Sequence, residues 1–130
     1  NKICWNGKYY THQVHIDPVK VEGVDEKKIL SLSNPYDINR GVTDHKQAVS
    51  IIREYQDRKK SLNPPPFAEW FSIQPAFPTG SFETTPNSWT YNSNEYVNGG
   101  IMPLVGGELS RASFNHGFET YGVGILQQYY

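Results

Sequence analysis

The sequence lacks the features of several common protein classes. Its single cysteine, Cys4, excludes a disulfide within the chain and leaves any zinc site to other ligand types. Twelve Lys and Arg residues stand against thirteen Asp and Glu residues, which gives a net charge of -1 and no basic excess for nucleic acid. No apolar run approaches the roughly 20 residues of a membrane-spanning helix. We therefore expect neither nucleic acid nor a membrane as a partner.

Sequence motifs for bound cofactors are also absent. The chain contains no P-loop, no dinucleotide-binding glycine pattern and no Gly-x-Ser-x-Gly elbow. His12 and His15 are three residues apart on a predicted strand, where they point to opposite faces and do not chelate one metal ion. We expect no cofactor and no metal site, and the sequence leaves the cellular compartment open.

Aromatic residues, in contrast, are abundant. Nine Tyr, six Phe and three Trp make up 14% of the 130 residues, whereas hydrophobic residues overall reach only 37%. Tyr and Trp combine an apolar ring with a hydrogen-bonding group, which suits a sugar-like or peptide-like ligand. The length fits a single domain over residues 1–130, or a fragment of a larger one.

The N-terminal segment predicts a small β-hairpin. Asn6 and Gly7 separate stretches rich in aromatic and β-branched residues, which is a strong hairpin signal. We expect strands on both sides of this turn, the second over 8–17. Because side chains alternate along a strand, Tyr10 is expected on the core face and Tyr9 on the opposite face.

The middle of the chain predicts two loops with a helix between them. Turn-forming residues are concentrated over 34–41 and predict a structured loop. Apolar residues at helical spacing then predict a helix over 43–60, with Thr43 as its N-cap. The proline-rich stretch over 61–80 excludes a helix and predicts a long extended loop that carries aromatic side chains.

The C-terminal third predicts a paired-glycine turn followed by two helices. In NGGIMP, Gly99 and Gly100 precede Pro103, which fits the first turn of a helix that Gly117 ends. A second helix follows over FETYGVGILQQYY, so that the two form an αα-hairpin. The apolar stripe expected on the first helix consists of Leu104, Val105, Leu109, Ala112 and Phe114. The predicted fold class is therefore mainly α, with a small N-terminal β-hairpin and long loops.

The stretch YVNGGIMPLVGGELSRASFNHG resembles the entrance to an inner helix of the (α/α)6 toroid glycosidases. This six-hairpin superfamily includes glycogen-debranching-type, trehalase-like and neutral-invertase-like enzymes. Its members often carry such a glycine turn, a large apolar residue and Pro before a helix that faces the sugar. Met102 stands where many of them have Trp. The N-terminal WNGKYYTHQV is similar to a further segment of these enzymes.

The resemblance implies that the chain is part of an (α/α)6 toroid whose helix entrances and loops form a carbohydrate pocket. A complete toroid has twelve helices and needs on the order of 300 residues, so the chain would supply about one third of it, from the C-terminal portion. The implied partners are a carbohydrate ligand and either the rest of the ring or further copies of the chain. The implied reaction is hydrolysis of a glycosidic bond. The alternative is a module that binds carbohydrate, or assembles through its helices, without catalysis.

Hydrolysis of a glycosidic bond needs two carboxyl groups, one as acid and one as base or nucleophile. Under the resemblance, Glu69 and Glu108 are the best-placed catalytic candidates. Glu69 lies in FAEWF, where Phe67 and Trp70 would shield it from water, and the alternative is an ordinary surface carboxylate. Glu108 lies off the apolar stripe of its predicted helix and faces either the pocket or solvent.

The candidates for substrate binding offer hydrogen-bonding groups or rings, and they are His12, Asp37, Arg40, Trp70, Tyr96, Asn98 and Gly99. The polar side chains would bond sugar hydroxyls, the two aromatic residues would stack on sugar rings, and the Asn-Gly turn would position further hydroxyls. For each of them the alternative is structural. The rings would then pack in the core, His12 would be an ordinary hydrogen-bonded residue, Asp37 and Arg40 would form an ion pair, and the glycines would make an ordinary turn before a helix.

Overall fold

The computed structural model describes residues 3–14, 22–62, 68–81 and 91–130. Four α-helices dominate these residues: α1 (Ser33–Asn39), α2 (His45–Ser61), α3 (Pro103–Asn115) and α4 (Glu119–Leu126). The described residues also form three short 3-10 turns, η1 (Glu26–Lys28), η2 (Ala68–Trp70) and η3 (Gln127–Tyr129), and an antiparallel pair of strands, β1 (Leu30–Ser31) and β2 (Ile73–Gln74). The predicted mainly-α class is confirmed, whereas the (α/α)6 ring stays a prediction.

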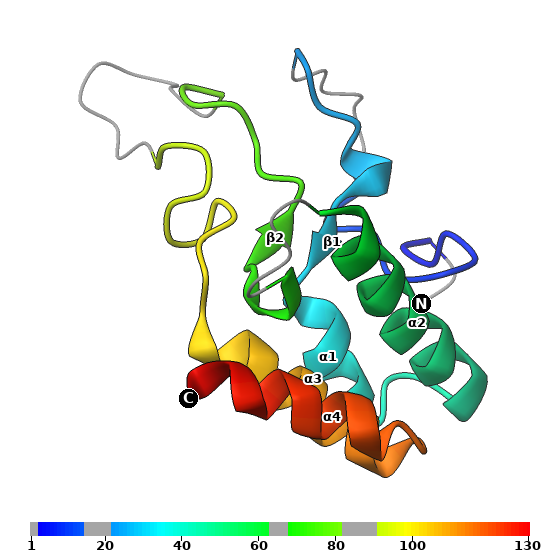
Figure 1. Cartoon of the computed structure of the whole chain (residues 1–130). Coiled ribbons are helices and arrows are strands. Elements are labelled where there is room, and N and C mark those ends of the chain that lie inside the picture. Colours follow the sequence, from blue (N-terminus) through cyan, green and yellow to red (C-terminus); the bar gives the residue numbers. More distant parts are fainter. Residues whose placement is uncertain (1–2, 15–21, 63–67, 82–90) are drawn as a thin grey trace.

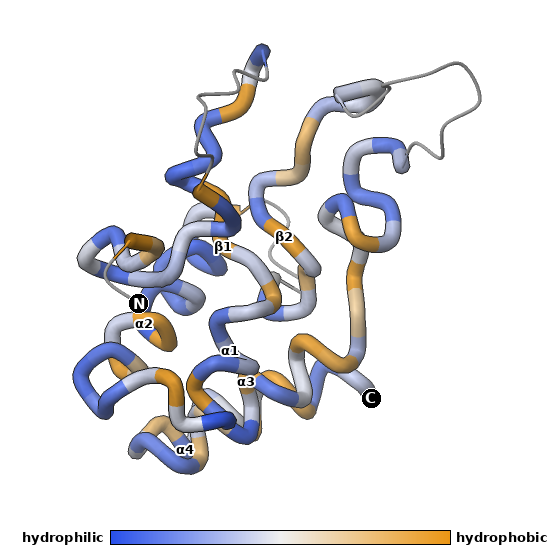
Figure 2. Tube along the Cα trace, turned by 180° about the vertical axis from the view of Figure 1, so that it is seen from behind, coloured by the Kyte–Doolittle hydropathy of each residue, from blue (hydrophilic) through white to orange (hydrophobic). Residues whose placement is uncertain are grey.

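The helices gather at one end of the molecule, and the irregular segments extend from the other (Figure 1). α3 and α4 run side by side, and α1 packs against α3. Figure 2 shows apolar residues where β1 and β2 pair and along α3. The main core lies among the four α-helices, and a smaller apolar group, Ile29, Ile73 and Phe77, lies at the paired strands. No helix in the described part of the chain has both the length and the apolar character needed to cross a membrane.

The helix predicted over 43–60 forms as α2, but its N-cap is Asp44 and the prediction of Thr43 is wrong. The Asp44 carboxylate accepts a hydrogen bond from Gln47 N at 2.8 Å, and the Gln47 side-chain oxygen accepts one from Asp44 N at 3.1 Å. This reciprocal capping box satisfies two backbone donors at once, which favours the start of the helix at this residue. The buried face of α2 carries Ala48, Ile51, Ile52 and Tyr55, as the helical spacing predicted.

The αα-hairpin predicted for the C-terminal third is confirmed as α3 and α4. Pro103 occupies the first turn of α3, and Gly117, at φ +84°, lets the chain reverse into α4. The stripe residues Val105, Leu109 and Ala112 are buried as predicted. Leu104 and Phe114 are instead 49% and 40% exposed. Each lies five residues from Leu109, which places its side chain about 140° away around the helix.

The loop predicted over 34–41 is wrong, because residues Ser33–Asn39 form helix α1. Pro35 lies in the first turn, where the missing N–H has no helical partner to lose. Asn34, predicted from the sequence to form a turn, is buried, and its side chain hydrogen-bonds to a residue distant in the sequence. Its Oδ1 accepts from Tyr10 N at 2.9 Å, and its Nδ2 donates to Tyr10 O at 3.0 Å. A tertiary contact therefore replaces the local turn that the composition predicted.

The predicted N-terminal hairpin is reduced to its turn and a single bridge between Trp5 and Tyr10. The next residue, Thr11, pairs with the first residue of β1, so the chain leaves the hairpin there. Tyr9 and Tyr10 are both 5% exposed, and the predicted alternation of core and solvent faces is therefore wrong. Residues 15–17 of the predicted second strand lie outside the described residues.

The glycine turn before α3 docks along the segment that was predicted as a proline-rich loop. Ser72 N donates to Gly100 O at 2.9 Å, and Met102 N donates to Trp70 O at 2.7 Å. These main-chain bonds position the start of α3 against η2. Residues 63–67 of the predicted loop lie outside the described residues.

Candidate functional site

Glu108 lies where α3 meets the C-terminal end of α1. The Asn39 amide donates to the Glu108 carboxylate at 2.6 Å, through Oε2, and to its main-chain oxygen at 2.7 Å. Arg40 Nη1 lies 3.7 Å from the same carboxylate oxygen, and the Glu108 side chain is 21% exposed. An amide and a guanidinium from α1 thus fix the position of a carboxylate that still reaches solvent.

Tyr36 and Asp37 precede Arg40 on α1, and both interact with it. Arg40 Cζ lies 4.3 Å from the centre of the Tyr36 ring, in cation–π contact, and its Nη1 donates to Tyr36 O at 3.3 Å. Burial raises the pKa of Asp37, and the positive charge of Arg40 partly opposes that rise. We call Tyr36, Asp37, Asn39, Arg40 and Glu108 the α1–α3 cluster.

The α1–α3 cluster unites three residues that the sequence nominated separately. Asp37, Arg40 and Glu108 were candidates for different roles, and the structure pairs Arg40 with Glu108, while the charge of Arg40 also acts on Asp37. The contribution of Asn39 was missed, because its place in a turn-rich stretch gave no sign that it would meet a residue 69 positions away. Two carboxyl groups in unlike surroundings form the kind of arrangement that acid–base chemistry requires.

Glu69 is fully buried on the opposite side of α3, so its interpretation as an ordinary surface carboxylate is wrong. Its Oε1 lies 2.7 Å from Lys59 Nζ, and its Oε2 accepts from Gln128 Nε2 at 3.1 Å. Burial, with a smaller contribution from the nearby Glu69 charge, raises the pKa of Tyr121 well above its usual range. Side chains from α2, α4 and η3 therefore enclose Glu69. Phe67, predicted to shield it, lies outside the described residues.

Glu69 and Glu108 do not face a common space. Gly106 of α3 packs directly against Trp70, the neighbour of Glu69, since a Cβ at Gly106 would lie 2.5 Å from the Trp70 ring. Glu108 is two residues further along α3, which turns its side chain by about 200° around the helix axis. The two predicted catalytic candidates therefore belong to opposite faces of α3.

Asn98 and Gly99 use their polar groups within the protein. The buried Asn98 side chain accepts from Phe77 N at 2.8 Å and donates to Phe77 O at 3.1 Å, with further contacts to main-chain oxygens of Tyr91 and Asn92. Gly99 N donates to Ser72 Oγ at 2.9 Å, and a Cβ at Gly99 would lie 2.7 Å from Ala76 Cβ. The close approach that needs glycine here is between two parts of the chain, which favours the structural alternative.

The other predicted ligand residues occupy three different surroundings. His12 lies against Phe77, with ring centres 6.1 Å apart, and burial lowers its pKa while the charge of Glu26 opposes the change. Trp70 is 1% exposed and meets Tyr129 edge to face at 4.3 Å, so its ring is committed to packing. Tyr96 is 62% exposed and presents its ring to solvent.

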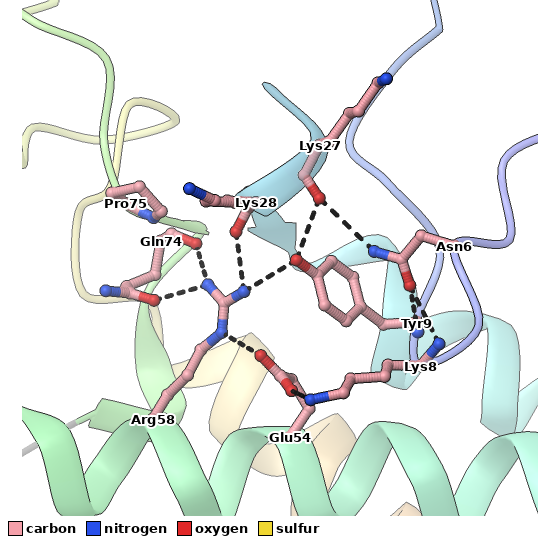
Figure 3. Close-up of a pocket in the computed structure, with 9 residues that line it drawn as sticks. All are labelled: Asn6, Lys8, Tyr9, Lys27, Lys28, Glu54, Arg58, Gln74 and Pro75. Carbon is pink, nitrogen blue, oxygen red and sulfur yellow. Dashed lines mark hydrogen bonds and ion pairs between the residues drawn. The ribbon is translucent and has the colours of Figure 1, made fainter. Parts of the chain in front are cut away.

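A groove of about 600 Å³ lies between the N-terminal turn, η1, α2 and β2 (Figure 3). Its lining residues are Asn6, Lys8, Tyr9, Lys27, Lys28, Glu54, Arg58, Gln74 and Pro75. Arg58 donates to Glu54 at 2.9 Å and bonds two oxygens of Gln74. It also donates to Tyr9 Oη at 3.0 Å and to Lys28 O at 2.7 Å. These bonds engage all three guanidinium nitrogens, so the residue joins four segments of the fold and is not free for a ligand.

No group of three or more His, Cys, Asp or Glu side chains within the described ranges is arranged to hold a metal ion. Comparison with known protein families, with curated proteins and with solved structures found no match to the chain. A function must therefore be sought in the contacts of the α1–α3 cluster and in the exposed surface around it.

Proposed function

We propose that the chain is a carbohydrate-active protein of the glycoside hydrolase class, with its acid–base centre in the α1–α3 cluster. The observation that carries this proposal is the Glu108 carboxylate, which Asn39 and Arg40 hold at a partly exposed contact between two helices. Asp37, three residues before Arg40, supplies a second carboxyl group, and its pKa is raised. Glycosidases need two carboxyl groups that differ in their affinity for a proton. The resemblance of the segment before α3 to the toroid enzymes supports the same class.

Each member of the cluster has a role in this proposal. Asp37 acts as the general acid, because the pKa of its partly buried carboxyl is raised and the group keeps a proton to higher pH than a free Asp side chain. Glu108 acts as base or nucleophile and is held in place by Asn39. Arg40 pairs with Glu108, and its charge partly opposes the rise in the pKa of Asp37. Helices beyond this chain would close the sugar pocket, as in an (α/α)6 ring.

The test is turnover of a panel of 4-nitrophenyl glycosides by the natural full-length protein. We expect Glu108→Gln and Asp37→Asn each to lower kcat/KM by about 100-fold or more, since each removes one proton-transfer group. The matched control is Glu119→Gln, an exposed carboxylate at the start of α4, which should leave turnover unchanged. Full turnover in both cluster variants would remove the hydrolase proposal.

A helical assembly module is the second candidate, because apolar side chains lie exposed along the α3–α4 hairpin. Leu104 and Phe114 on α3 are 49% and 40% exposed, and Val123 and Leu126 on α4 are 44% and 39% exposed. Such side chains favour contact with another helix pair, whether from a second copy or from the rest of a ring. Light scattering tests this candidate. Phe114→Ser should lower the measured mass if the surface assembles, and a wild-type monomer at high concentration would count against it.

A further inference from the structure

Tyr96 adopts a backbone conformation that disfavours its own side chain. Its φ is +39°, in the left-handed region where Gly and Asn are common and a bulky aromatic residue is rare. Asn94, two residues earlier, has φ +68°. Conformations of this kind persist only where the surrounding structure determines them strongly, and they are concentrated at functional sites.

Hydrogen bonds on both sides hold this segment in place. Tyr96 O accepts from Gly100 N at 2.9 Å and from the Ser72 hydroxyl at 2.8 Å. A Cβ at Gly100 would lie 2.5 Å from Tyr96 N, so the two stretches of backbone are in direct contact. Asn94 N donates to Asn98 O at 2.8 Å, and the Asn98 side chain is itself anchored in the core. The backbone that presents Tyr96 is therefore rigid.

The fold gains little from the ring that this backbone carries. The Tyr96 residue is 62% exposed, and its ring lies 5.4 Å from that of Tyr91 at an angle of 57°. Tyr91 is itself 38% exposed, and neither phenol oxygen has a hydrogen-bond partner among the described residues. Gly or Asn would meet the backbone requirement at lower cost. The presence of Tyr in this conformation therefore points to a contact outside the chain.

We propose that Tyr91 and Tyr96 form an aromatic platform that binds a pyranose ring of an oligosaccharide by stacking. This inference rests on the proposed function and adds a substrate subsite to it. A pyranose offers an apolar C–H face and a rim of hydroxyls, which match the apolar face and the polar tip of Tyr. Val97 and Ile101, 45% and 53% exposed, extend the apolar surface of the same segment. Residues 91–102 contain no Lys or Arg, which favours an uncharged ligand over a phosphate or nucleic acid.

The test is isothermal titration of the full chain with maltohexaose, cellohexaose, xylohexaose and mannohexaose. We expect at least one of them to bind, and Tyr96→Asn to weaken that binding at least about ten-fold, the scale of one lost aromatic contact. Tyr96→Asn should have a Tm equal to or above that of the wild type, because Asn tolerates φ +39°. Tyr96→Phe should retain the affinity within about three-fold, because the stacking face remains.

The matched control is Tyr130→Asn, which alters a fully exposed Tyr far from the segment in sequence and should leave the affinity unchanged. Absence of binding by all four saccharides, or equal affinity in Tyr96→Asn and wild type, would overturn the platform. So would a change of mass in Tyr96→Asn without saccharide binding, which would assign the rings to a protein contact.

The same titration separates the platform from the proposed hydrolase activity. Glu108→Gln should abolish turnover yet still bind the saccharide at Tyr96. Weakened binding in Tyr96→Asn, together with turnover that is indifferent to Glu108→Gln and Asp37→Asn, would keep the platform and remove the hydrolase. Normal binding in Tyr96→Asn together with loss of turnover in the cluster variants would keep the hydrolase and remove the platform.

Discussion

One carboxylate next to one cation lies on each side of α3, and the two sides differ in almost every other respect. Glu69, on the side that Gly106 approaches, is fully buried with Lys59 Nζ at 2.7 Å. Glu108, on the other side, is 21% exposed with Arg40 Nη1 at 3.7 Å. The same pair of charges therefore occurs once in the interior of the fold and once at its surface.

The difference shows why a carboxylate enclosed by aromatic residues is not thereby a catalytic one. A buried charge loses its hydration, so its counter-charge becomes obligatory and the pair is committed to the fold. At a partly exposed position water compensates either charge, and the pair contributes little to stability. A carboxylate that does not hold the fold together is available for chemistry. This contrast is why the proposed function places the reaction at Glu108 and not at Glu69.

The largest expected effect comes from breaking the buried pair. Lys59→Met leaves the Glu69 carboxylate without its cation in the interior, and we expect the free energy of unfolding to fall by about 3 kcal/mol. This value is at the low end for a buried pair, because the Lys59 side chain is 35% exposed. Urea denaturation followed by circular dichroism measures it.

The exposed pair supplies the control for that experiment. Arg40→Met should lower the free energy of unfolding by less than about 1 kcal/mol, because the Arg40 side chain is 56% exposed and its charge is screened. The double variant Lys59→Met with Glu69→Leu should recover most of the loss, since no unpaired charge then remains. Equal losses in the two single variants would contradict the comparison.

Two neighbouring glycines of α3 sharpen the contrast without any change of charge. Gly106→Ala directs a Cβ into the buried Trp70 ring, with 2.5 Å to its nearest atom, and should destabilise the fold by about 2 kcal/mol through overpacking. Gly107→Ala meets nothing within 4 Å and should stabilise it by up to about 1 kcal/mol, because Ala favours a helix over Gly. Thermal unfolding compares the two, and a shift of the same sign in both would show that the faces of α3 do not differ in this way.

The elements that sequence could predict are those with local signals. The cap of α2 is three residues from its partner Gln47, and Pro103 and Gly117 mark the two ends of α3 within the chain itself. These helix ends do not depend on distant residues, so the helices form close to the positions that the periodicity predicted. Even the error at Thr43 is only one residue.

The parts that sequence missed depend on contacts between distant segments. α1 forms in a turn-rich stretch because Asn34 hydrogen-bonds to Tyr10 across the fold. β1 and β2 have two residues each, which is too short for an alternation of apolar and polar residues to be recognised. At the site, Asp37, Arg40 and Glu108 were predicted from their residue types. No feature of the neighbouring sequence indicated that Asn39 would hydrogen-bond to Glu108. Aromatic neighbours suggested that Glu69 is shielded, whereas its pairing with Lys59 is visible only in three dimensions.

The smallest effect is expected at the C-terminal end of α3, where the paired groups are two histidines. His116 Nδ1 lies 2.9 Å from Nδ1 of His45, the first residue of α2. The ring centres are 5.1 Å apart, and the ring planes are inclined by 21°. One nitrogen must donate and the other accept, and two protonated rings would therefore lose the hydrogen bond.

The pH dependence follows from the lowered pKa of His116, caused first by burial and then by the charge of His45. The unfolded chain binds more protons than the native one between that lowered value and about 6.5, so stability rises with pH across this window. The contribution is complete above about pH 6.5 and lost as the pH falls, and we expect a few tenths of a kcal/mol because the pair is exposed. Urea midpoints between pH 5.5 and 8 should fall less steeply on acidification in His116→Asn than in the wild type. His12, whose pKa is also lowered, is present in both proteins, so its contribution cancels in the comparison. An identical dependence of the urea midpoint on pH in the two proteins would show that the histidine pair does not link α2 to α3.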